Sequence, residues 1–425
     1  MDITKLSTIK YWGASTSAHQ VEGRNHNQWS VWELAHARQL ASSAESKLAG
    51  WLPQWEQFKA EAAQPANYVS GLAVDHYNRY ETDFDIAQEL NLNAFRLSIE
   101  WSRVEPKAGK WDEREIEHYR QVLQALHRRG LTPFVCLWHW TVPVWFDEMG
   151  GFTQKANVAH FVRFAEKMAV ELGEYMSYLI ILNEPNTYIG QSYHLGEWPP
   201  NQRSLRQAIK VYNNLMRAQR AVYQSLRPIN KRFKMGIAQN TAYSYLGDDT
   251  RRSRTAKRLR DLIWNKWFFN RTEKYHDFIG VNFYHSGRLI KGRVNNQNRR
   301  QSDLGWNMEP GNIEHVLKDM YAEYGKPLIV TENGLADAAD ESRQWWLEET
   351  LKGLSKAVAA GVPVDGYLHW SLIDNFEWAY GFWPRFGLVE VDRSDKKLPR
   401  AIRPSAKWWA GELKKIRVNA QKQSE

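Results

Sequence analysis

Two glutamates stand directly after short apolar runs of the sequence, and their immediate neighbours are polar. Glu184 follows such a run within LNEP, and Glu332 follows another within VTENG. Two carboxyl groups on opposite sides of a pocket can cleave a glycosidic bond, one as proton donor and the other as base or nucleophile. That chemistry needs surroundings that separate the two pKa values. The alternative for each glutamate is a surface carboxylate or a charge at a helix N-terminus.

Further polar and aromatic residues lie within or after the other apolar runs, toward their ends. Recognition of a sugar needs many hydrogen-bonding groups and an aromatic face under the apolar side of the ring. The sequence supplies both kinds of group: Gln20, Arg96, His139, Trp140, Asn183, Asn282, Tyr284, Trp370, Glu377 and Trp378. A structural histidine or a core tryptophan is the ordinary alternative for any single member, and their joint placement favours a binding site.

The hydrophobic pattern indicates the elements that must position these residues. Short runs rich in β-branched and aromatic residues have the length and character of strands covered on both faces. There are eight such runs, at 11–15, 94–99, 133–138, 178–182, 234–238, 278–282, 327–330 and 364–370. Segments with helical periodicity lie near 77–90, 113–128, 158–172, 205–226, 256–270, 313–324, 342–359 and 405–416.

Eight alternations of strand and helix predict an α/β fold, a single (β/α)8 TIM barrel. We expect residues 1–425 to form one domain, with a polar and frayed tail from about Lys414. The stretches 20–74 and 283–312 exceed ordinary connections, so we expect long loops at the C-terminal face of the barrel. Because active sites of this fold lie at that face, the polar residues that follow the strands should meet in one pocket.

Composition limits the compartment and the partners. Cys136 is the only cysteine, which excludes an internal disulfide and fits a reducing compartment. The N-terminal residues lack the apolar core of a signal peptide, and the longest uncharged stretch, 131–146, is short for a bilayer span. The net charge of +9 comes without a nucleic-acid-binding motif. We therefore expect a cytoplasmic protein with no nucleic-acid or membrane partner.

The motifs, in their order along the chain, resemble those of glycoside hydrolase family 1, the retaining β-glucosidase and β-galactosidase family. The matching segments are SAHQVEG, FRLSIEWSRVEP, LWHWTVP, LNEP, IGVNFY, VTENG and WSLIDNFEWAYGFWPRFGLVEVD, between residues 11 and 392. NEP alone is shared by several related barrel hydrolases, whereas TENG together with NFEW is highly specific. The segment GYLHWSL is similar to the archaeal β-glycosidases of the family, and its His369 replaces a residue that is often aromatic or aliphatic.

The resemblance implies a role for each matching residue. Glu184 would be the general acid/base and Glu332 the nucleophile, with Arg96 and Tyr284 keeping Glu332 ionised and oriented. Trp306 would lie on the aglycone side. The residues implied to bind the terminal sugar are Gln20, His139, Trp140, Asn183, Asn282 near the 2-hydroxyl, Tyr284, Trp370 as a stacking platform, Glu377 and Trp378.

The activity implied by the resemblance is that of a retaining exo-β-glycosidase, which acts by double displacement on short oligosaccharides or on aryl and alkyl glycosides. It implies no metal and no cofactor. Members that act on phosphorylated sugars carry a serine where Glu377 stands, so we expect unphosphorylated glucosides and galactosides as substrates. The 283–312 segment is short for the family, and the natural aglycone, the linkage and the oligomeric state stay open.

Three other functions remain to be compared with this one. A non-catalytic carbohydrate-binding barrel is disfavoured because both glutamates and the residues around them are present. An endo-acting glycanase of a related barrel family would share NEP, but not the combination of TENG and NFEW. A metal-dependent barrel hydrolase is disfavoured because no His-x-His or His/Asp ligand cluster follows the first strand.

Overall fold

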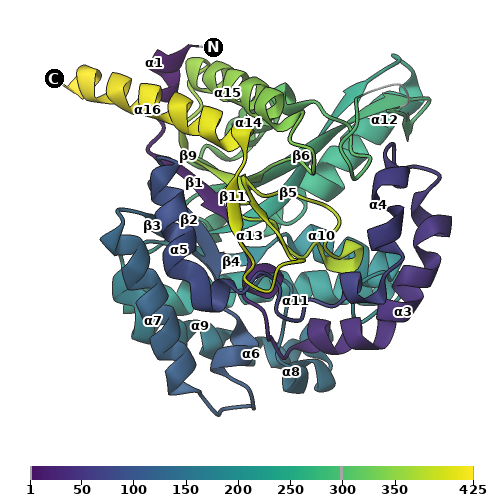
Figure 1. Ribbon diagram of the computed structural model, residues 1–425, viewed down its shortest axis with the longest axis vertical. Helices are drawn as coiled ribbons and strands as arrows, with labels where there is room; N and C mark the ends of the chain where they lie inside the picture. Colours follow the sequence, from purple (N-terminus) through teal and green to yellow (C-terminus); the bar gives the residue numbers. More distant parts are fainter. Residues whose placement is uncertain (1, 297–299, 425) are drawn as a thin grey trace.

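The computed structural model describes residues 2–296 and 300–424, and it contains a closed barrel of parallel strands (Figure 1). In these residues, the barrel strands are β1 (Tyr11–Ser15), β2 (Ala94–Ser98), β3 (Thr132–Cys136), β4 (Tyr178–Asn183), β5 (Lys234–Leu246), β6 (Ile279–Ile290), β8 (Leu328–Asn333) and β9 (Val364–Trp370). Neighbours pair in parallel in the order β5-β4-β3-β2-β1-β9-β8-β6, and the pairing of β5 with β6 closes the ring. The predicted (β/α)8 barrel is confirmed.

Helices surround the ring and alternate with its strands (Figure 1). The longer ones are α3 (Gln28–Leu48), α5 (His76–Glu89), α7 (Glu113–Arg128), α9 (Val158–Leu172), α11 (Leu205–Ile229), α12 (Arg251–Arg260), α14 (Ile313–Tyr324), α15 (Arg343–Ala359) and α16 (Pro404–Ser424). Each parallel connection passes through at least one helix, as a parallel sheet requires. Helix α7 shows the local cause: the side chain of Asp112 caps its N-terminus, and its apolar face is buried.

Short helices and strands connect the barrel strands to the longer helices. The α-helical turns are α1 (Ile3–Leu6), α2 (Ala18–Val21), α4 (Trp55–Ala62), α6 (Trp101–Val104), α8 (Val144–Glu148), α10 (Pro185–Ile189) and α13 (Phe269–Thr272). Two π-helical segments, η5 (Gly190–Leu195) and η6 (Asp261–Lys266), follow α10 and α12. The remaining strands are β7 (Arg293–Val294), which extends the sheet beside β6, and the antiparallel pair β10 (Val389–Val391) and β11 (Arg400–Ile402).

The barrel strands form because both of their faces are buried. A cluster with side chains from around the ring fills the interior: Ala94, Phe134, Cys136, Ile180, Ala238, Phe278, Ile329 and Leu368. A much larger cluster lies between the strands and the helices. Gly280 shows how tightly β5 and β6 approach, since a Cβ at this position would lie 2.4 Å from the carbonyl oxygen of Ile237. This packing fixes the strand ends, and with them the site that they carry.

Several boundaries differ from the sequence predictions. Strands β5 and β6 continue past the barrel to Leu246 and Ile290, so the expected loop 283–312 begins as strand. The stretch 20–74 is largely helical, in α3 and α4, and not a long loop. The helix predicted near 256–270 starts at Arg251 and continues as the π-helical segment η6. The tail expected to fray from Lys414 continues α16 to Ser424, because Leu413 and Ile416 are buried against the barrel.

In the described part of the chain, no helix is long and apolar enough to cross a membrane.

Candidate active site

The carboxylate of Glu332 is held by two residues from neighbouring strands. Glu332 lies in β8, and a register shift in the pairing with β6 falls between Val281 and Asn282, at the point where Glu332 is paired. Such an irregularity redirects a side chain. Arg96 of β2 forms a buried ion pair with Oε1 of Glu332, and the Tyr284 hydroxyl donates to Oε2 at 2.6 Å. Each carboxylate oxygen therefore has one protein donor.

The carboxyl group of Glu184 lies in a different environment, without a cation. Glu184 follows β4, and its side chain is 2% exposed. The amide Nδ2 of Asn282 donates to its Oε1 at 2.7 Å, and that of Asn240 donates to its Oε2 at 3.2 Å. Burial, followed by the charge of Glu332, raises the pKa of Glu184 to about 7, although the amide donors act in the opposite direction.

A hydrogen-bond network behind the cavity connects the two glutamates. Arg96 Nη2 donates to Oδ1 of Asn183 at 2.6 Å, and Asn282 Nδ2 lies 3.3 Å from the same oxygen. The amide Nδ2 of Asn183 lies 3.2 Å from Nε2 of His139. Burial would lower the pKa of Arg96, but the Glu332 carboxylate raises it above its ordinary value, so the guanidinium stays charged. The relative positions of both glutamates are thus set by shared partners.

The third cavity glutamate, Glu377, follows β9 and lies among amides. Asn375 donates to its Oε2 at 3.0 Å, and Nε2 of Gln20 lies 3.4 Å from the same oxygen. The same Gln20 nitrogen donates to the Phe376 carbonyl at 2.8 Å, which ties the segment after β1 to the loop after β9. Burial raises the pKa of Glu377 to about 8, and the charges of Glu332 and Glu184 add to this effect.

These groups surround one cavity of about 580 Å³. Aromatic rings form much of its wall, namely His139, Trp140, Trp198, Tyr284, Trp306, Trp370, Trp378 and Tyr380. The His139 and Trp370 rings lie nearly parallel, 5.9 Å apart, and Trp140 packs against Trp378 at 4.9 Å. Three cavity residues have left-handed backbones, with φ of 42° at Glu184, 72° at Trp140 and 51° at Trp378. Strain of this kind concentrates at functional sites, where packing holds a side chain in place.

The structure brings most of the predicted site residues to this cavity and places the others behind its wall. Those that line it are Gln20, His139, Trp140, Glu184, Tyr284, Trp306, Glu332, Trp370, Glu377 and Trp378. Arg96, Asn183 and Asn282 are fully buried behind the cavity wall: Arg96 contacts Glu332, Asn282 contacts Glu184, and Asn183 accepts from Arg96. For Asn282 we expected a place near a substrate hydroxyl, and its amide instead donates to Glu184. His369 lies outside the cavity and contacts the Tyr367 hydroxyl at 3.1 Å.

Residues that the sequence analysis did not select also belong to the site or support it, among them Asn240, Trp264, His19 and Glu33. Asn240 contacts Glu184 from the part of β5 beyond the predicted strand end, and its Oδ1 accepts from Trp264 Nε1 at 3.2 Å. His19 forms a buried pair with Glu33 of α3 at 2.6 Å and stacks on Trp378 with ring centroids 5.5 Å apart. A polar residue two positions after the predicted strand end at 238 was the available signal for Asn240, which is half-buried in β5. Nothing in the local pattern indicated that α3 would buttress the site.

The structure describes no group of three or more His, Cys, Asp or Glu side chains arranged to hold a metal ion, within residues 2–296 and 300–424. The cavity therefore offers carboxyl groups, amides and aromatic rings as its chemical equipment. A parallel (β/α)8 barrel with two buried glutamates at strand ends, one paired with a cation and one not, is the arrangement of a glycoside hydrolase.

Comparisons with known proteins identify the family. The sequence model described as Glycosyl hydrolase family 1 matches residues 9–281 and 273–417, and the chain belongs to this family. It is 27% identical to beta-glucosidase A of Thermotoga maritima over 97% of this chain and 99% of that protein. It is 30% identical to a beta-galactosidase of Sulfolobus acidocaldarius over 78% of this chain and 82% of that protein. The family assignment from the motifs is confirmed, and the chain is a β-glycosidase.

The solved structures agree with this assignment. A beta-glycosidase from Pyrococcus horikoshii superposes with a TM-score of 0.83 at 33% sequence identity, over 96% of this chain and 94% of that one. A beta-glucosidase from Thermotoga maritima gives a TM-score of 0.82 at 24% identity, which shows a common fold.

Proposed function

We propose that the chain is a retaining exo-β-glycosidase in which Glu332 is the nucleophile and Glu184 the general acid/base. The observation that carries this proposal is the opposite electrostatics of the two carboxyl groups in one cavity. Glu332 is paired with Arg96, which favours its ionised form. Glu184 accepts from the amides of Asn282 and Asn240, and no ion pair involves it in residues 2–296 and 300–424. Its pKa is raised to about 7, so at mildly acidic pH it carries the proton that a leaving group needs.

The first step forms a glycosyl-enzyme. A carboxylate oxygen of Glu332 attacks the anomeric carbon as the bond from that carbon to the leaving oxygen breaks, and Glu184 transfers its proton to that oxygen. Arg96 and Tyr284 hold the attacking carboxylate so that it meets the sugar in a fixed orientation.

The second step follows from the charge that the first one removes. Once Glu332 is esterified, its negative charge no longer raises the pKa of Glu184. Glu184 therefore becomes a stronger acid, keeps its carboxylate form and takes a proton from the incoming water. The water oxygen then attacks the anomeric carbon and releases Glu332, so the product keeps the β configuration. One structural arrangement thus serves both halves of the reaction.

His139 supplies a donor toward the sugar. Burial lowers its pKa far below the ordinary value, so the imidazole is neutral. With Asn183 Oδ1 accepting from Arg96, the Asn183 amide nitrogen faces His139 Nε2, which leaves the ring proton on Nδ1. That Nδ1 has no hydrogen-bond partner among the described residues. A sugar hydroxyl would provide the partner that this buried donor lacks.

Glu377 and Gln20 favour an unphosphorylated sugar. Both line the cavity, and no ion pair involves Glu377 in residues 2–296 or 300–424. A phosphate dianion beside Glu377 would lose its hydration and meet the negative charge of Glu332, and no described ion pair places a cation at Glu377 to offset this. A carboxyl group with a pKa near 8 can donate to or accept from a neutral hydroxyl. We therefore expect terminal β-glucosides and β-galactosides, and little activity on 6-phosphorylated analogues.

Two further properties belong to this proposal. We propose that residues 1–425 form one domain, because a single ring of strands receives elements from the whole length of the described chain. We also propose a cytoplasmic role in carbohydrate metabolism, which the single, buried cysteine supports. A single cooperative unfolding transition tests the first statement, and localisation of the tagged chain tests the second.

Chemical rescue by azide tests the assignment of the two glutamates. With a 2,4-dinitrophenyl β-glucoside, which leaves without protonation, Glu184→Ala should bind azide on the face that water uses and yield the β-glycosyl azide. With the same β-glucoside, azide in the position emptied by Glu332→Gly should attack the anomeric carbon from the α face, displace the dinitrophenolate and yield the α-glycosyl azide. The control is Glu390→Gly. Because Glu390 is 57% exposed and lies outside the cavity, this variant should show no activation by azide. Full activity of Glu332→Gly without azide would refute the proposal.

A further inference from the structure

Arg260 is the one lysine or arginine among the residues that line the cavity in the described part of the chain. It ends α12, and the adjoining segment η6 contributes Ile263 and Trp264 to the same wall. Three carboxyl groups, those of Glu184, Glu332 and Glu377, lie in the same cavity. The cavity thus contains one guanidinium, from an element separate from the strand ends that carry the glutamates.

The guanidinium of Arg260 has no carboxylate partner in residues 2–296 and 300–424. Its Nε lies 3.3 Å from the Ser244 hydroxyl, a neutral group. Two other cations of α12 are paired, Lys257 with Asp261 at 2.6 Å and Arg254 with Asp249 at 2.7 Å. Partial desolvation lowers the pKa of Arg260, yet a guanidinium remains charged at neutral pH. This cation is therefore free to bind an anion in the cavity.

The wall that carries Arg260 lies on the side of the leaving group. The carboxyl of Glu184 accepts from Asn240, and Asn240 in turn accepts from Trp264 of η6. Because Glu184 protonates the leaving oxygen in the proposed function, the wall in contact with this chain of bonds faces the aglycone. Leu259 and Ile263 beside Arg260 are exposed and line the same cavity. The wall thus combines apolar surface with one positive charge.

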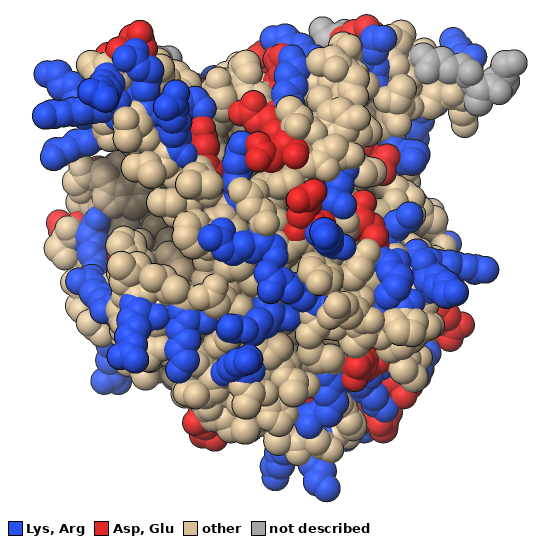
Figure 2. Space-filling view, turned by 180° about the vertical axis from the view of Figure 1, so that it is seen from behind, with Lys and Arg blue, Asp and Glu red and all other residues tan. Residues whose placement is uncertain are grey.

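The other neighbours of Arg260 do not cancel that charge. His285 is half-buried nearby, and desolvation, followed by the charge of Arg260, lowers its pKa to about 4, so it is neutral. The rings of His285 and Trp306 lie 5.9 Å apart and form an aromatic surface on this part of the cavity. Figure 2 shows Lys and Arg side chains gathered at the upper left, where α12 lies, with a hollow in the surface below them.

We propose that Arg260 binds a carboxylate on the aglycone, so that the enzyme prefers aryl β-glycosides with an acidic aglycone. The proposal rests on the proposed function and adds a substrate class to it. The apolar wall would contact the aromatic ring of such an aglycone, and the guanidinium would pair with its carboxylate. The sugar would still be bound by the neutral groups around Gln20 and His139.

A matched pair of substrates tests this proposal. The two are 4-carboxyphenyl β-glucoside and its uncharged methyl ester, and release of each phenol is followed by chromatography. Dividing kcat/KM for the acid by kcat/KM for the ester gives a preference ratio for each variant. In Arg260→Gln this ratio should fall about fivefold, mainly through KM for the acid, because a rim charge pair contributes modestly. Activity on the ester should stay within about twofold of wild type.

Two further variants make the result specific. Arg260→Lys keeps the charge and should retain much of the preference. Arg258→Gln removes an exposed cation from the same helix, outside the cavity, and should leave the ratio unchanged. An unchanged ratio in Arg260→Gln, or an equal fall in Arg258→Gln, would overturn the proposal and leave a general basic surface as the explanation. If wild type cleaved neither substrate, the proposed function itself would fail.

Discussion

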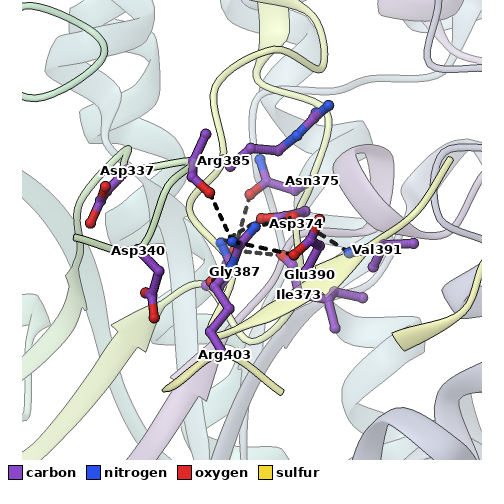
Figure 3. A network of polar contacts seen from close by, with 12 residues as sticks. Asp337, Asp340, Ile373, Asp374, Asn375, Arg385, Gly387, Glu390, Val391 and Arg403 are labelled. Atoms are coloured by element: carbon purple, nitrogen blue, oxygen red, sulfur yellow. Dashed lines mark hydrogen bonds and ion pairs between the residues drawn. The ribbon is translucent and has the colours of Figure 1, made fainter. Parts of the chain in front are cut away.

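Two buried arginine–carboxylate pairs in this barrel differ in what surrounds the carboxylate. Asp374, in the loop after β9, pairs with Arg403 at 2.9 Å and also accepts from the backbone N–H of Gly387 at 2.9 Å (Figure 3). Arg403 donates in addition to the Gly387 carbonyl at 3.1 Å. Neither residue lines the catalytic cavity. This pair fastens the loop that continues to Glu377 to Arg403, which follows β11, and both side chains also contact the backbone of Gly387 before β10.

The pair of Arg96 and Glu332 uses the same chemistry to a different end. Each oxygen of Glu332 has one side-chain donor, from Arg96 or Tyr284, and the carboxylate borders the open cavity. Asp374, by contrast, is enclosed by backbone amides and a guanidinium. The comparison teaches that burial and an ion pair alone do not identify a catalytic carboxylate. The unfilled side of the carboxylate does, because a reacting atom can approach only there.

The largest expected effect is the loss of turnover in Glu332→Gln. Removal of the proposed nucleophile should lower kcat by a factor on the order of 10⁴ or more, as removal of a nucleophile does in other hydrolases. Steady-state assays with a nitrophenyl β-glucoside measure this, and circular dichroism checks that the variant is folded. The control Glu390→Gln alters the exposed carboxylate that lies 3.6 Å from Arg403 and should keep full activity. If Glu332→Gln kept more than a tenth of wild-type activity, the carboxylate of Glu332 would not be catalytic and its contrast with Asp374 would fail.

Disruption of the pair of Asp374 and Arg403 should have the opposite effect, a loss of stability with turnover retained. Asp374→Asn leaves the buried Arg403 charge with only the exposed Glu390 carboxylate, 3.6 Å away, so the free energy of unfolding should fall by up to about 3–5 kcal/mol. The part that remains folded should keep kcat within about tenfold, since Asp374 does not contact the cavity. Urea unfolding and assays at low temperature separate the two quantities. Asp365→Asn removes the exposed pair with Lys10 and should change stability by less than about 1 kcal/mol. Equal stability losses in both variants would contradict this account.

Tyr284→Phe tests the second donor of Glu332 without removing the ion pair. A hydrogen bond to a charged group contributes about 1.5–3 kcal/mol, so kcat/KM should fall roughly 10- to 150-fold. The matched control is Tyr367→Phe, which removes a buried hydroxyl outside the cavity. This hydroxyl donates a hydrogen bond of 3.0 Å to Asn333. That variant should lose stability and keep its turnover number. If the two variants had the same kinetic loss, the role of Tyr284 would be structural only.

The smallest expected effect is a shift in pH dependence. Because Glu184 must be protonated for the first step, kcat/KM should fall as the pH rises through its pKa of about 7. Asn240 stabilises the ionised form of Glu184, so Asn240→Ala should raise the pKa of Glu184. The fall of kcat/KM at alkaline pH should then shift to higher pH by a fraction of a unit. Full pH profiles measure the shift. If the alkaline fall of kcat/KM shifted to lower pH, Asn240 would act on Glu184 in another way.

The barrel was predictable because its signals are local. The strands at Tyr11–Ser15 and Val364–Trp370 match the predicted runs residue for residue, since each is an apolar run bounded by polar residues. The extensions of β5 and β6 were not predictable in this way. Beyond the barrel the two strands pair with each other, Tyr243 with Ser286 among others, and their alternating pattern lacks a continuous apolar run. Local hydrophobicity therefore marks the ring and misses what is added to it.

The site residues were predicted or missed for the same physical reason as the strands. Residues directly after a strand, such as Glu184 and Trp370, were selected because strand ends of a barrel converge on one face. Asn240 was missed because the predicted strand ended at residue 238. The placement of Asn282 against Glu184 depends on a contact between residues 98 positions apart, which no local pattern contains. Sequence patterns thus indicate which residues reach the cavity, and the tertiary structure decides which of them touch one another.

The most direct test of the central claim traps the covalent intermediate. A 2-deoxy-2-fluoro β-glucoside with a good leaving group should inactivate the enzyme by slowing both steps and allowing the glycosyl-enzyme to accumulate. Peptide mapping by mass spectrometry then locates the attached sugar. We predict one fluoroglucosyl group per chain, attached to Glu332 and absent from the Glu332→Gln variant. A label on Glu184 or Glu377, or inactivation without a covalent sugar, would contradict the assignment of Glu332 as the nucleophile.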